Sequence, residues 1–110
     1  MWLLRDGEVL ASLEIATSRR DRVRGLLGRD GIDGALLLRP GRSVHTVGMR
    51  FAIDVAYCRP DAGGLRVIAT ATMRPWRAGY PRLRARGVIE AAAGAFDRWG
   101  LTTGDLLEIK

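Results

Sequence analysis

The sequence predicts an α+β fold: a single compact, β-rich domain built on a curled, mostly antiparallel sheet or a partly open barrel, with two short helices. Three observations support this prediction. Apolar runs of strand length recur along the chain and are separated by Gly, Pro and Asp. Helical periodicity is confined to two short stretches. The 110 residues fit one domain and leave no room for two ordinary ones, and the 47% of hydrophobic residues makes a single core feasible, so residues 1–110 are expected to form one domain.

Six or seven strands are expected at the apolar runs. The runs at 1–5 and 8–16 flank Asp6-Gly7, a pair whose tolerance of positive φ is typical of a tight hairpin turn. The loop at 60–64 is too short for the crossover that parallel pairing requires, so the strands that it joins are predicted to pair antiparallel. Those strands lie at 53–59 and 65–74, and further strands are expected at 35–39, 87–91 and 105–109.

Two short helices are expected between the strands. The first begins after Ser18, whose hydroxyl suits a helix N-cap, and Gly28 is predicted to end it in a left-handed conformation. The second is expected at 93–99 and ends at Gly100. The segment 75–86 contains too many Pro and Gly residues to form a regular element.

The net charge of +6 is concentrated in one part of the chain. Residues 62–89 contain six arginines and no acidic residue, whereas the rest of the chain is neutral. Such a segment favours a surface that attracts anions. A compositional explanation competes, because only one of the eighteen basic residues is a lysine, as a GC-rich genome would produce. The sequence alone leaves both explanations open.

The sequence also argues against several classes of protein. One cysteine, Cys58, excludes a disulfide within the chain, and its place in a strand pattern is typical of a small buried residue. One histidine and one cysteine cannot form a structural zinc centre, so neither a metal site nor a cofactor is predicted. No apolar run is long enough for a signal peptide or a membrane span. We therefore expect a cytoplasmic protein.

The stretch from 45 to 55 carries most of the residues with chemical potential. His45, Asp54 and Glu90 are the candidates for acid–base work, because a histidine oriented by a carboxylate is the usual general base. A small hydrolase or isomerase that uses His45 and Asp54 is one alternative, although no nucleophile stands at a diagnostic position. The structural alternative is that both side chains hydrogen-bond to backbone groups and hold the loop in shape.

A second candidate surface lies within the basic segment. Arginines alternate there with aromatic residues, a pattern that could hold a phosphate backbone and stack bases. No known nucleic-acid-binding motif accompanies the pattern, and the alternative is a solvated loop whose Trp76 covers the edge of the core. The candidate anion-binding or nucleic-acid-binding residues are Arg74, Trp76, Arg77, Tyr80, Arg82, Arg84 and Arg86.

Four blocks of sequence, in this order, resemble the DUF192 family of small bacterial and archaeal domains. Residues 24–29 (RGLLGR) are similar to its R-G-L-M-G-R block, and residues 45–55 (HTVGMRFAIDV) to its central H-T-x-x-M-R-F-x-I-D motif. Residues 88–94 (VIEAAAG) resemble its V-L-E-x-x-x-G strand, and residues 101–105 (LTTGD) its closing G-L-x-x-G-D. The chain departs from the pattern at Leu27, where the family usually has Met.

The resemblance implies a compact β-rich domain with short helices, and it supplies no catalytic residue, cofactor or substrate. A second departure is Ala52, where the family commonly has Pro. We expect a small binding or accessory module whose partner is a small anionic ligand or a protein. We also expect Arg24 and Arg50 to approach Asp54 or to share an anion pocket. The predicted ligand-binding residues are Arg24, His45, Thr46, Met49, Arg50 and Asp54.

Overall fold

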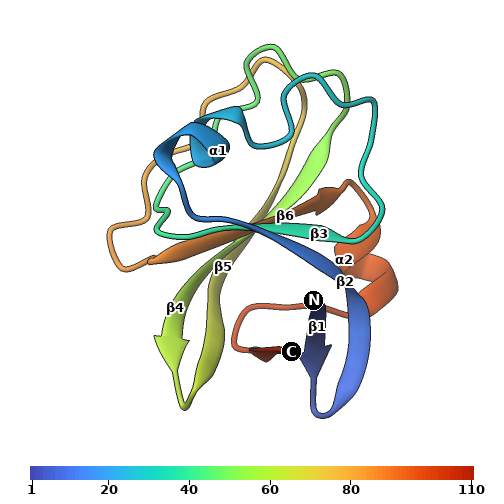
Figure 1. The fold of residues 1–110 in the computed structure, drawn as a ribbon, viewed down its shortest axis with the longest axis vertical. Helices are drawn as coiled ribbons and strands as arrows, with labels where there is room; N and C mark the ends of the chain where they lie inside the picture. Colours follow the sequence, from blue (N-terminus) through green and yellow to red (C-terminus); the bar gives the residue numbers. More distant parts are fainter.

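Seven strands close into a barrel in the computed structural model, which describes residues 1–110 (Figure 1). The strands follow the order β1-β2-β3-β6-β4-β5-β7 around the barrel, and only β2 and β3 pair in parallel. The strands are β1 (Trp2–Arg5), β2 (Glu8–Ala16), β3 (Ala35–Leu38), β4 (Ile53–Asp61), β5 (Gly64–Met73), β6 (Gly87–Ala92) and β7 (Leu106–Ile109), and the helices are α1 (Arg19–Arg24) and α2 (Ala95–Trp99).

Both predicted hairpins are confirmed, and the sheet closes more completely than the sequence indicated. Asp6 and Gly7 form the turn between β1 and β2 with φ of 52° and 78°, and β4 pairs antiparallel with β5. The barrel closes because β1 also pairs with β7. The backbone N–H of Trp2 donates to the carbonyl of Lys110 at 2.6 Å, and the N–H of Lys110 donates back at 3.0 Å. The two ends of the chain therefore lie side by side (Figure 1).

Side chains fill the interior of the barrel. Every strand contributes apolar residues to this core, and Ala95 and Phe96 of α2 cover it where β6 ends. Cys58 is fully buried there, and burial raises the pKa of its thiol to about 12. A thiol with such a pKa stays protonated and packs as a small apolar side chain.

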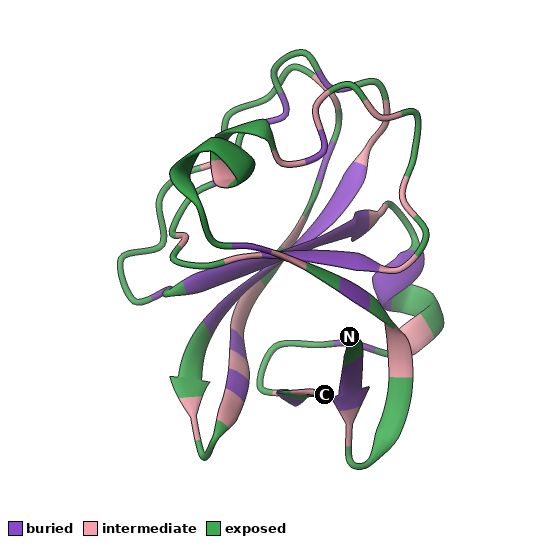
Figure 2. Ribbon diagram, viewed as in Figure 1, coloured by how far each residue is buried: buried purple, intermediate pink, exposed green.

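A second core lies on the outer face of β3, β6 and β4. Leu36, Val55 and Val88 point outward from these strands, and long loops cover them with Leu26 and Met49 among other side chains. The central strands are consequently buried on both faces, while α1 itself remains at the surface (Figure 2). Neither helix is long and apolar enough to span a membrane.

The first helix begins as predicted but ends earlier. Ser18 caps it by accepting a hydrogen bond from the Asp21 amide at 3.1 Å. The helix ends at Arg24, and its C-cap is Gly25, with φ of 47°, rather than Gly28. Gly28 does have a positive φ of 82°, but it lies in the following turn. The chain leaves the helix early because Leu26, which is 1% exposed, is inserted into the outer core.

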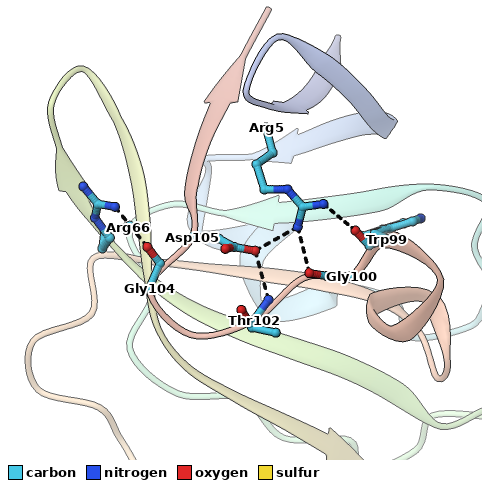
Figure 3. Close-up of polar contacts among 7 residues, drawn as sticks. All are labelled: Arg5, Arg66, Trp99, Gly100, Thr102, Gly104 and Asp105. Carbon is cyan, nitrogen blue, oxygen red and sulfur yellow. Dashed lines mark hydrogen bonds and ion pairs between the residues drawn. The ribbon is translucent and has the colours of Figure 1, made fainter.

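A polar network fastens β1 to the segment that links α2 with β7 (Figure 3). The Arg5 guanidinium donates to the Asp105 carboxylate at 2.9 Å and to the carbonyls of Trp99 and Gly100 at 2.7 and 2.9 Å. Asp105 also accepts from the Thr102 amide at 3.0 Å. A cation at the C-terminal end of α2 matches the partial negative charge of that helix end. The closing block of residues 101–105 therefore has a structural role.

Candidate ligand-binding site

A small cavity lies between α1, the loop at 43–49 and the outer face of the barrel. Its volume is about 60 Å³, enough for a few water-sized groups. The apolar part of its wall consists of Val23, Leu26, Leu27, Leu38, Val44 and Met49. The polar part consists of Arg22, Arg24, Ser43, His45 and Glu90, with the backbone of Gly25 completing the lining.

Glu90 is the acidic side chain of this cavity. It lies in β6 between Leu36 of β3 and Val55 of β4, and strand alternation points it to the outer face with Val88. The residue is 4% exposed, and its side chain forms no hydrogen bond or ion pair. Every polar side-chain atom of the protein that is closed off from solvent has a hydrogen-bond partner. The Glu90 oxygens have none, so they must reach solvent through the cavity. Burial raises the pKa of Glu90 to about 7.

Gly25 lets the backbone pass close to Glu90. Its φ of 47° belongs to the region that residues with a side chain rarely adopt. A Cβ at this position would lie 3.6 Å from Oε1 of Glu90 and would take up part of the cavity. The glycine that ends α1 therefore also leaves space above the carboxylate.

Three of the six predicted ligand-binding residues line this cavity. Arg24 and His45 are exposed at its rim, and neither side chain has a hydrogen-bond or ion-pair partner. Met49 is buried in its wall. The backbone of His45 forms a bridge with Ala78, which holds the rim to the basic segment.

Thr46 lies next to His45 in sequence but points into the protein. Its side chain is fully buried, and its hydroxyl donates to the carbonyl of Arg74 at 2.6 Å. The same oxygen accepts from the amide of Arg77 at 2.9 Å. The backbone of Thr46 also exchanges hydrogen bonds with Trp76 and Arg77. This threonine attaches the irregular segment 74–86 to the rest of the fold.

The structure places Arg50 and Asp54 away from the cavity. Arg50 forms an exposed ion pair with Asp30 at 2.9 Å. Asp54 lies in β4 on the opposite face of the sheet from Glu90, with Ala56 and Cys58. Its carboxylate accepts from the Thr72 hydroxyl at 2.8 Å and, at 3.0 and 3.1 Å, from two amides at the start of α2, those of Gly94 and Phe96. Neither Arg24 nor Arg50 pairs with Asp54, so the prediction that these arginines approach Asp54 is wrong.

The basic and aromatic residues at 74–86 form an exposed segment. Trp76 is 65% exposed and Tyr80 is 88% exposed. Several of the predicted arginines are engaged within the protein: Arg82 lies over the ring of Tyr57, 5.4 Å from its centroid, and Arg86 donates to the carbonyls of Leu83 and Ala85. Arg77 bonds to the carbonyl of Trp76, while Arg74 and Arg84 have no side-chain partner.

Sequence reasoning named Glu90 as an acid–base candidate but did not place it in the ligand-binding set. A signal was available, because an acidic residue interrupts a strand that is otherwise apolar, from Gly87 to Ala92. An acid at such a position needs a partner or a functional reason. Arg22 and Ser43 were also missed, and no spacing in the sequence connects them with Glu90.

Comparisons with known proteins agree with the fold and give the family. The model of the DUF192 family, described as an "Uncharacterized ACR", matches residues 2–109. The chain belongs to the DUF192 family. A UPF0127 protein of Pyrococcus furiosus is 31% identical over 70 residues, which are 64% of this chain and 58% of that protein. The chain thus spans little more than half the length of this relative.

Two solved structures share the barrel fold of this chain. One is a protein of unknown function from Novosphingobium aromaticivorans, with a TM-score of 0.76 over 88% of this chain and 74% of that one. The other, from Sinorhizobium meliloti, is described as a "putative transcription regulator" and has a TM-score of 0.80 over 97% of this chain and 89% of that one. Both are 20% identical to this chain, a level at which the likeness concerns the fold alone.

Three of the four DUF192 blocks meet at the cavity. Residues 24–29 contribute Arg24, the central block contributes His45 and Met49, and the β6 block contributes Glu90. These blocks are far apart in sequence, and only the tertiary fold brings them together. The fourth block belongs to the Arg5 network on another part of the barrel.

Proposed function

We propose that this DUF192 domain is a binding module that takes the polar end of a small ligand into the Glu90 cavity. The observation that carries the proposal is a carboxyl group that is 4% exposed, has no partner in the protein and opens into a cavity rimmed by Arg24 and His45. Burying a carboxylate without a partner is costly, and a protein that only needed stability would place an apolar side chain there. A ligand that donates a hydrogen bond to Glu90 would supply the missing partner.

Binding accounts for this geometry better than hydrolysis or isomerisation by His45 with Asp54. Those two side chains lie on opposite sides of the sheet, and the Asp54 carboxylate already accepts three hydrogen bonds. Ser43 and His45 both line the cavity, but no hydrogen bond joins them as a nucleophile and its base would need. Of the three acid–base candidates, only His45 and Glu90 line this cavity.

The exposed aromatics of segment 74–86 favour a second candidate function, binding of single-stranded nucleic acid. Trp76 and Tyr80 could stack on bases, and the unengaged Arg74 and Arg84 could contact phosphates. Labelled DNA and RNA should then bind at low salt and dissociate steeply as salt rises. The double variant Arg74→Ala/Arg84→Ala should bind more weakly than the matched Arg19→Ala/Arg20→Ala variant. Absence of binding at low salt rules this candidate out.

The cavity proposal can be tested by nuclear magnetic resonance with small probes. We would titrate the ¹⁵N-labelled protein with acetamide, acetate, ethylamine and glycine, each at millimolar concentrations. The proposal expects at least one probe to shift the amides of Gly25, His45, Met49 and Glu90 together. The shifts should be absent in Glu90→Gln and retained in Glu108→Gln, which changes an exposed glutamate on β7. If no probe moves this group of resonances, the cavity is not a binding site.

A further inference from the structure

The inner and outer parts of the Glu90 cavity have opposite charge. Inside, the carboxyl group of Glu90 is the acidic group of the lining. At the rim stand Arg22, Arg24 and His45. The Arg22 guanidinium is already engaged, because it donates to the carbonyls of Thr17 and Pro40 at 3.2 Å each. Arg24 and His45 have no such partners and can turn toward a ligand.

This arrangement disfavours ligands that carry a single charge. A simple anion would be drawn to the rim arginines but repelled by ionised Glu90. A simple amine would find Glu90 but would have to pass two arginines of its own charge. An apolar group would leave the buried carboxylate without a partner, which costs free energy on binding. Only a ligand with a donor at one end and an anion at the other satisfies both parts of the site.

We infer that the cavity binds a small zwitterion of the amino-acid type, with its ammonium group on Glu90 and its carboxylate at Arg24 and His45. This inference rests on the proposed function and names the ligand class for the same site. An ammonium group with one attached carbon is small enough to enter a space of about 60 Å³. The rest of the ligand would remain at the rim, where the exposed side chains leave room for it.

The same chemistry could come from a free amino acid or from the N-terminal residue of a peptide. In a peptide, the ammonium group is retained but the neighbouring carboxylate is replaced by an amide. The exposed, unpartnered guanidinium of Arg24 favours the free amino acid, because guanidinium binds a carboxylate more strongly than a neutral carbonyl. Glycinamide, which has the peptide's amide, therefore distinguishes the two sources.

Calorimetric titration of the whole chain would test the inference. Glycine, β-alanine and γ-aminobutyrate vary the separation of the two charges, while ethylamine, acetate and glycinamide each lack one part. The best zwitterion should bind at least about tenfold more tightly than ethylamine or acetate, and more tightly than glycinamide. Arg24→Ala should weaken its binding about tenfold, whereas Arg20→Ala, an exposed arginine of α1 outside the cavity, should leave binding unchanged. Glu90→Gln should abolish it, with a thermal melt to show that the variant is folded.

Several outcomes would overturn the inference. Ethylamine binding as tightly as the best zwitterion would show that the rim cations take no part. Equal affinities for Arg24→Ala and Arg20→Ala would do the same, and tighter binding of glycinamide would point to a peptide end. If acetamide or acetate shifts the cavity resonances but no zwitterion binds, the ligand class is wrong and the binding site stands. If no probe of any kind reaches the cavity, the proposed function fails as well.

Discussion

Asp54 and Glu90 are two buried carboxyl groups on adjacent strands, and their surroundings differ completely. Asp54 pairs in register with Ala91, and Glu90 pairs with Val55, so the two lie almost side by side along the sheet. Asp54 is 5% exposed and accepts three hydrogen bonds. Glu90 is 4% exposed and accepts none. Burial alone therefore does not distinguish the two carboxyl groups, whereas the number of hydrogen-bond partners does.

The largest loss of stability should come from removing the Asp54 carboxylate, which has three hydrogen-bond partners. Asp54→Ala leaves two amides at the start of α2 without their acceptor, and the Phe96 amide is buried. We expect the free energy of unfolding to fall by about 3 to 4 kcal/mol, since hydrogen bonds to a charged group each contribute about 1.5 to 3 kcal/mol. Urea denaturation would measure this loss, with Asp33→Ala as the control for an exposed aspartate. A loss below about 1 kcal/mol would show that the hydrogen bonds to Asp54 contribute little to stability.

Replacing Glu90 by the neutral glutamine should instead favour the folded state at alkaline pH. The pKa of Glu90 is raised from 4.5 to about 7, so the folded state holds this proton more tightly than the unfolded chain. Stability from this group is therefore present at acid pH and is lost as pH rises from about 4.5 to about 7. Between about pH 4 and pH 8 the wild type should therefore lose about 3 kcal/mol of stability that Glu90→Gln keeps, so the variant gains on the wild type as pH rises. That difference corresponds to a Tm change on the order of 10 °C.

Thermal melts of the wild type, Glu90→Gln and Glu108→Gln at mildly acid and mildly alkaline pH would test this prediction. The wild type should lose stability between the two conditions relative to Glu90→Gln, while Glu108→Gln should follow the wild type. If Glu90→Gln is less stable than the wild type at alkaline pH, the carboxylate has a partner in solution, and the contrast with Asp54 disappears.

Thr46 is an uncharged example of a buried polar group whose hydrogen-bond partners give it a structural role. Its buried hydroxyl both donates to Arg74 and accepts from Arg77. Thr46→Val keeps the shape but removes both bonds, so we expect a loss of about 2 kcal/mol and faster hydrogen exchange at the Arg77 amide. Thr70→Val, at an exposed position of β5, provides the control. An unchanged exchange rate at Arg77 would mean that the segment 74–86 is held by other contacts.

The smallest effect on stability should come from His45, the neighbour of Thr46. Its side chain is exposed and has no partner, so His45→Ala should change the free energy of unfolding by less than about 0.5 kcal/mol. The same variant should weaken binding of the best zwitterion. A stability loss as large as that of Thr46→Val, measured in parallel, would show that His45 belongs to the structure rather than to the site.

The strands could be predicted because their signals are local. Asp6-Gly7 and the short loop at 60–64 fix two hairpins through the residues that form them. Closure of the barrel could not be predicted, since it depends on Leu3 pairing with Ile109 across almost the whole chain. The end of α1 was misplaced because Gly25 and Gly28 both suit positive φ, and only the burial of Leu26 decides between them.

The candidate site was harder to predict from the sequence because it also depends on contacts between distant parts of the chain. His45 and Asp54 are close in sequence, but the chain enters the sheet between them, and they end on different sides of it. Asp54 finds its partners at Gly94 and Phe96, about forty positions away. Arg24 and Glu90 meet at one cavity because the chain at the end of α1, at Gly25, passes close to Glu90 of β6. Proximity in sequence therefore predicted a site that the three-dimensional fold divides.

Closure of the barrel by β1 and β7 has a consequence for the order of events during synthesis. A nascent chain that has not yet released residues 106–109 from the ribosome has no partner for the free side of β1 or for the start of β5. Both edges offer unpaired backbone groups to any neighbouring strand. Because the final pairing joins the two ends of the chain, the protein should fold slowly and only after translation of β7. These edges of β1 and β5 therefore stay open to aggregation until β7 has been made and has paired with them.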